Sequence, residues 1–73
     1  MSKTATEPQV KHEIHRIDIM IRHLHGLHSE ARALQDRDLR EAVSLSIDDM
    51  IESLQDERMK MQFFVEHHFR YQH

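Results

Sequence analysis

The residues with the widest chemical repertoire are histidines, of which there are eight among 73 residues. His12 and His15 are spaced i,i+3, so on a helix they would lie close enough to share a metal ion. If the chain folds back on itself, His67 and His68 would approach the same end of the molecule. These four residues are candidate ligands for a divalent metal such as zinc or nickel, and the competing interpretation is a solvated polar surface.

A second chemistry is phosphotransfer. The triplet His12-Glu13-Ile14 is similar to the start of the phosphoacceptor motif in histidine-kinase dimerisation domains, which are dimeric helical hairpins. The resemblance covers three residues and ends at His15-Arg16-Ile17, where those domains carry Arg-Thr-Pro. It implies that His12 could accept a phosphoryl group, and it does not assign the chain to that family.

No pattern indicates an enzyme. A single glycine excludes a glycine-rich phosphate loop, and the carboxylates between Asp48 and Glu57 lack the Glu-x-x-His spacing of di-iron proteins. We interpret those carboxylates as a solvated acidic surface. The sequence therefore predicts a non-enzymatic protein with no obligatory cofactor.

Composition limits the partners. A formal net charge of −3 gives no field that would attract nucleic acid or an anionic membrane. No apolar run approaches the roughly 20 residues that a membrane span requires. The first ten residues lack the apolar stretch of a secretory signal, so we expect a cytoplasmic protein.

Hydrophobic periodicity predicts a first helix from about Glu7 to about Gln35. Its apolar residues recur three or four positions apart: Val10, Ile14, Ile17, Ile21, Leu24, Leu27, Ala31 and Leu34. That spacing is typical of an amphipathic α-helix. Thr6 and Gln9 have capping-box spacing, with Pro8 in the first turn. Gly26 indicates a close helix crossing or a mild kink, and the alternative is a break there, with Ser29 capping a new helix.

A turn is expected at residues 35–38, which contain no apolar side chain, with Asp38 capping the second helix. That helix would run from about Leu39 to about Phe69, with Arg58 inside its apolar stripe. The alternative is one unbroken helix in a long coiled coil. We therefore expect an all-α, antiparallel two-helix hairpin over residues 7–70, between a disordered tail at 1–6 and a frayed end at 71–73.

Apolar surface exceeds what one hairpin can cover. Leu45, Met59 and Phe63 fall on the side of the second helix away from its main stripe, and we interpret them as a surface that binds another protein. The first stripe is also too wide for contact with a single partner helix. A homodimer that forms a four-helix bundle would cover this surplus. His28, inside the first stripe, would then be a candidate pH-sensitive contact at the dimer interface.

Overall fold

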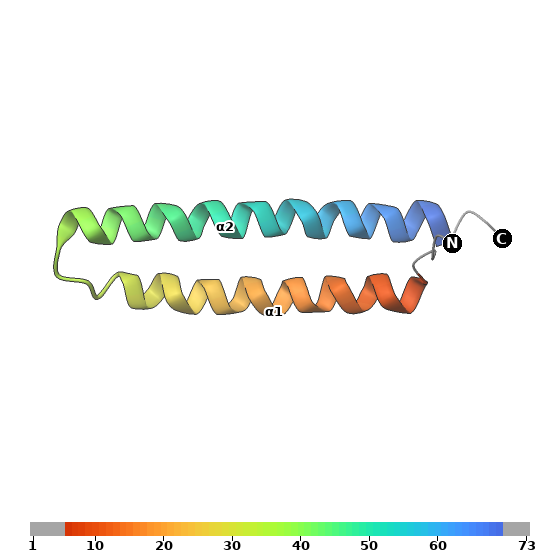
Figure 1. Cartoon of the computed structure of the whole chain (residues 1–73), viewed down its shortest axis with the longest axis horizontal. Coiled ribbons are helices and arrows are strands. Elements are labelled where there is room, and N and C mark those ends of the chain that lie inside the picture. Colours follow the sequence, from red (N-terminus) through yellow and green to blue (C-terminus); the bar gives the residue numbers. More distant parts are fainter. Residues whose placement is uncertain (1–5, 70–73) are drawn as a thin grey trace, which may run out of the picture.

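The computed structural model describes residues 6–69 as two antiparallel helices that lie side by side (Figure 1). Helix α1 spans Glu7–Ala31, helix α2 spans Arg37–Phe64, and a short π-helix, η1, continues from Val65 to Phe69. The predicted hairpin is confirmed, and the alternative of one unbroken helix is wrong. Residues 1–5 of the expected tail at 1–6 lie outside the described residues, as does the expected frayed end at 71–73, whereas Thr6 is described and caps α1.

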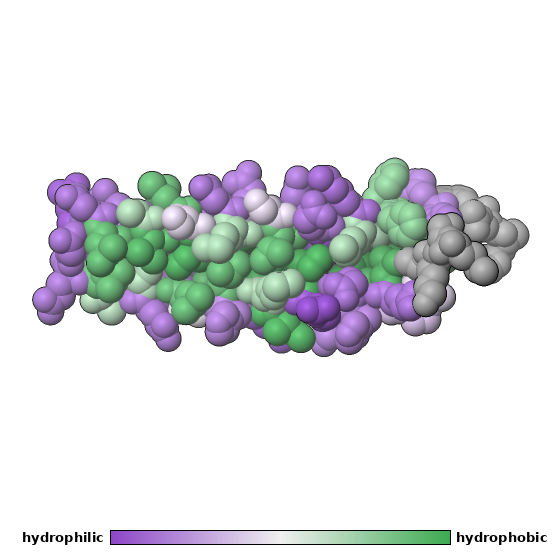
Figure 2. All heavy atoms as spheres, viewed as in Figure 1, coloured by the Kyte–Doolittle hydropathy of each residue, from purple (hydrophilic) through white to green (hydrophobic). Residues whose placement is uncertain are grey.

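The core consists of two small apolar clusters along the contact between the helices. One, near the free ends of the hairpin, joins Val10 and Ile14 of α1 to Val65. The other, near the connection, joins Ala31 to Ile47 and Ile51 of α2. Figure 2 shows a band of apolar residues that follows the line between the helices on the viewed face. Burial of these stripes stabilises the pairing of the two helices.

Helix α1 begins as predicted. The backbone N–H of Gln9 donates to Thr6 Oγ1 over 3.4 Å, and the backbone N–H of Thr6 donates to Gln9 Oε1 over 2.9 Å. This capping box satisfies two N–H groups that the helix itself leaves unpaired. The helix continues without a break through Gly26. A Cβ atom placed on Gly26 would meet nothing within 4 Å, so Gly26 does not mark a close crossing with α2 of the same chain.

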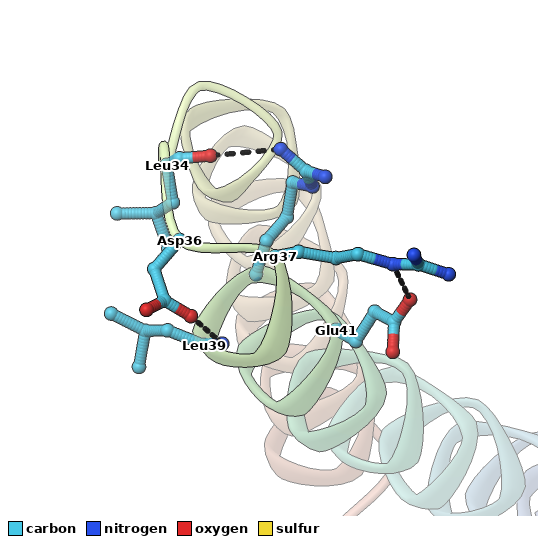
Figure 3. Close-up of polar contacts among 6 residues, drawn as sticks. Leu34, Asp36, Arg37, Leu39 and Glu41 are labelled. Carbon is cyan, nitrogen blue, oxygen red and sulfur yellow. Dashed lines mark hydrogen bonds and ion pairs between the residues drawn. The ribbon is translucent and has the colours of Figure 1, made fainter.

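The connection between the helices differs from the prediction. Helix α1 ends at Ala31, four residues before the predicted end, because backbone bonds from residues 33 and 34 reach only three residues back and tighten the last turn. Asp36, and not Asp38, caps α2: its carboxylate accepts the backbone N–H of Leu39 over 2.9 Å (Figure 3). The guanidinium of Arg40 donates to the carbonyl of Leu34 over 3.0 Å, and this bond holds the connection against α2.

The C-terminal end of the described chain packs beside the start of α1, as the sequence predicts. Val65 is the most buried residue, with 1% of its surface exposed, and Met61 and Phe69 pack against the cluster that it forms with Val10 and Ile14. Sequence periodicity predicts an uninterrupted α-helix to Phe69, whereas the structure changes to π-helix at Val65. This last turn therefore closes the open end of the hairpin with apolar side chains.

Candidate interaction surfaces

The two packed helices have two broad faces, one on each side of their contact line. On one of these faces polar side chains of α1 and α2 contact each other across the line. On this side the Arg58 guanidinium donates to the carboxylate of Asp18, and His28 Nε2 lies 3.2 Å from Asp48 Oδ1. Arg58, which periodicity places inside the apolar stripe of α2, thus meets an acidic partner. The two pairs also fix the register, because Asp18 lies level with Arg58 and His28 lies level with Asp48.

The other side of the contact line, which we call the groove face, has no such bridge between the helices among the ion pairs of residues 6–69. A hollow of about 660 Å³ lies near the middle of both helices. Its lining residues are Ile19, Met20, His23, Leu24, Asp49, Met50, Ser53 and Leu54. Most of that lining is apolar, so the hollow places hydrophobic side chains in water, at a cost that burial would remove.

A second apolar hollow, of about 410 Å³, lies on the same side nearer the free ends. Its lining residues are Gln9, Val10, Glu13, Lys60, Met61 and Phe64. Helical periodicity places Arg16 and Glu57 between the two hollows. Each lies three or four residues from a lining residue of the first hollow and three or four residues from a lining residue of the second. The groove face thus has a charged stretch towards the free ends and an apolar stretch towards the connection.

Helical periodicity places Met20, Leu27 and Met50 within the apolar stripes of the two helices. In the structure these side chains instead expose between 38% and 48% of their surface. The width of the stripe on the first helix was the available signal, because it exceeded what one neighbouring helix can cover. Which edge of the stripe stays exposed depends on how the two helices are rotated against each other, and periodicity alone does not define that rotation.

The residues predicted to bind another protein are exposed but not contiguous. Leu45, Met59 and Phe63 each expose 63% to 68% of their surface. Leu45 and Met59 are 14 positions apart on one helix, which corresponds to about 21 Å along its axis. Phe63 stacks on His67, with ring centroids 3.8 Å apart. Met59 and Phe63 are four positions apart on the same helix and are neighbours on its surface. They form one surface, which we call the outer patch, while Leu45 lies apart from it.

The four candidate metal ligands do not form a metal-binding cluster. Within residues 6–69, no three histidine, cysteine, aspartate or glutamate side chains are close enough together to hold a metal ion. His67 Nδ1 lies 3.0 Å from the carbonyl oxygen of Phe63, and His68 stacks on Phe64. His12 and His15 are exposed on α1. These contacts favour a packing role for the C-terminal pair, and His12 stays an untested phosphoacceptor candidate.

His28 has an identified partner within its own chain. Its side chain is 21% exposed and faces Asp48, a residue that the sequence placed on a solvated acidic surface. The predicted contact of His28 across a dimer interface is not tested by a single chain. The observed pair already accounts for a histidine at this position, since one imidazole nitrogen meets a carboxylate oxygen at hydrogen-bonding distance.

Comparisons of the chain with protein-family models, with curated proteins and with solved structures found no match. The two helices of the described region are also not apolar enough to be membrane-spanning candidates.

Proposed function

We propose that this chain is a small, non-enzymatic helical interaction module, an adaptor or regulator that works as a homodimer and binds another protein. One observation carries the proposal: within residues 6–69 the large apolar side chains left exposed outnumber the buried hydrophobic residues of the core. The exposed ones are Ile19, Met20, Leu27, Leu39, Leu45, Met50, Met59, Phe63 and Phe64.

Chain length supports self-association. A domain of about 60 to 70 residues buries only about 60% of the surface that its unfolded chain exposes, so its stability alone is marginal. The chain has no cysteine and therefore no disulfide to supplement so small a core. Association of two hairpins into a four-helix bundle would bury the groove faces and add the missing apolar contact.

The outer patch supports binding of a second protein. Met59 and Phe63 line neither hollow of the groove face, so a four-helix bundle built on that face would leave them accessible. Aromatic and methionine side chains such as Phe63 and Met59 are enriched at protein interfaces. The surface that joins two copies and the surface that holds another protein can therefore be separate.

Sedimentation equilibrium between about 1 and 100 μM tests self-association, because this range brackets micromolar dissociation constants. We expect the mass to approach twice 8.8 kDa as the concentration rises, equally with and without a chelator. A monomer at every concentration would overturn the homodimer. A dimer that requires zinc or nickel would favour the histidine-based metal-binding alternative.

Binding of another protein is tested by affinity capture with Phe63→Ser. We expect the variant to remain a dimer and to lose partners that the wild-type chain retains, because the change removes an exposed aromatic contact. Equal capture by both chains would show that the outer patch is not the binding surface.

A further inference from the structure

We propose that the groove face is the dimer interface, with two hairpins packed so that their connections lie at the same end and α1 of each rests on α2 of the other. This inference rests on the proposed self-association and adds the face, the orientation and the residues. The two-fold axis would run parallel to the helices, so residues that are level within one hairpin would face each other between copies.

The charged stretch of the groove face supports this orientation. The register makes Arg16 level with Lys60. Glu13 lies one turn nearer the free ends on α1, and Glu57 lies one turn nearer the connection on α2. Each acid is paired with a base in its own helix, Glu13 with Arg16 at 3.1 Å and Glu57 with Lys60 at 3.6 Å. Each helix thus presents one acid and one base, with the two bases level and the two acids on opposite sides of them along the axis.

In the proposed dimer this arrangement becomes complementary. Lys60 of one copy is level with Arg16 of the other. Glu13 therefore lies about 4.5 Å along the axis from Lys60 of the second copy, because the three residues from Glu13 to Arg16 rise by that amount. Arg16 has the same relation to Glu57 of the second copy. Long side chains span such an offset. Arg16 is itself level with Lys60 of the second copy, so on each side of the axis two bases lie between two acids and form one neutral cluster. With the connections at opposite ends, α1 would face α1, and neither pairing would form.

The apolar stretch is self-complementary in the same orientation. His28 is level with Asp48, so Leu27 is level with Asp49 and faces Met50 of the second copy. His23 is level with Ser53, a small residue that leaves space in the hollow. Methionine side chains are flexible enough to fill such a gap. Leu27 and Met50 therefore meet between the copies, while the charged stretches meet each other.

The groove face is also large enough. Helix α2 is about 42 Å long, and two packed helices are roughly 20 Å wide, which gives a face of about 800 Å². A standard protein interface buries about 800 Å² on each partner. A second copy of this chain therefore satisfies the size, the charge order and the apolar pattern of this surface together.

A charge-exchange experiment tests the orientation. Glu13→Lys and Lys60→Glu each place two like-charge contacts in a homodimer, so each variant should dimerise at least about tenfold more weakly than the wild type. In a mixed dimer of the two variants each cluster again holds two acids and two bases. An equimolar mixture should therefore recover dimer, measured by sedimentation and by native mass spectrometry. Lys11→Glu and Glu52→Lys, away from the groove face, form the control pair and should show neither loss nor recovery.

A distance measurement gives an independent readout. The chain has no cysteine, so Gln35→Cys carries a single spin label at the connection. Connections at the same end give a separation below about 30 Å by pulsed electron paramagnetic resonance, whereas opposite ends give about 42 Å or more, the length of α2.

The outcomes separate the two proposals. A wild-type monomer at every concentration overturns the proposed homodimer and this interface with it. A wild-type dimer with long label distances, or one in which the mixed variants recover nothing, overturns the proposed interface and leaves the homodimer intact. Recovery in the mixture together with short label distances supports the interface.

Discussion

Asp18 of α1 accepts a hydrogen bond from the Arg58 guanidinium of α2 across the contact line between the helices. Arg58 occupies a position that periodicity places within the apolar stripe, and its side chain is less than half exposed. Its aliphatic stem packs while its charged end reaches the carboxylate at the edge. The pair therefore helps to fix the register on which the proposed dimer contacts depend.

Removal of this pair should destabilise the hairpin modestly. We expect Asp18→Asn or Arg58→Met to lower the free energy of unfolding by about 1 kcal/mol, because solvent screens a pair that is only partly buried. A double-mutant cycle followed by urea unfolding would measure the coupling. The exposed pair Arg37–Glu41, 3.3 Å apart, is the control and should give a coupling near zero. Equal coupling in both pairs would contradict the role assigned to Arg58.

The N-cap of α2 can be tested by two aspartates two positions apart. Asp36→Ala should cost about 1 kcal/mol, because the backbone N–H of Leu39 loses its acceptor. Asp38→Ala should cost less, since Asp38 lies inside the first turn and contributes mainly through the helix dipole. Thermal unfolding by circular dichroism would compare them. A larger loss for Asp38→Ala would restore the cap that the sequence predicts.

Gly26→Ala should stabilise the protein by about 1 kcal/mol, because alanine has the higher helix propensity and the added methyl group meets no atom within 4 Å. The expected readout is a higher Tm at fixed protein concentration. Gly26→Pro serves as the opposite control, since proline inside a helix costs about 3 kcal/mol. A lower Tm for Gly26→Ala would show that another chain approaches this position in the assembly.

Two similar substitutions on α2 should separate the two surfaces. Met50→Lys places a charge in the proposed dimer interface and should weaken dimerisation at least about tenfold, because a buried charge without a partner is costly. Leu45→Lys, at a more exposed position outside the groove face, should leave the dimer unchanged. Sedimentation equilibrium would measure both. Equal weakening by both variants would argue against an interface limited to the groove face.

Much of the fold follows from local sequence patterns. The spacing of apolar residues from Val10 onward predicts helix α1, and the Thr6–Gln9 capping box predicts where it begins. These features were predictable because each depends on residues within one or two helical turns. The surplus of apolar residues also follows from the sequence, since it needs only a count of helical faces.

Tertiary structure decided which residues meet. Helical periodicity placed Met20 and Met50 within the stripes that should be buried, and the packing of one helix on the other leaves both exposed on the groove face. The packing of the two helices also pairs His28 with Asp48, 20 positions away. The reason is physical: periodicity defines the direction of each side chain around its own helix, whereas the rotation and register between two helices depend on contacts between residues distant in sequence.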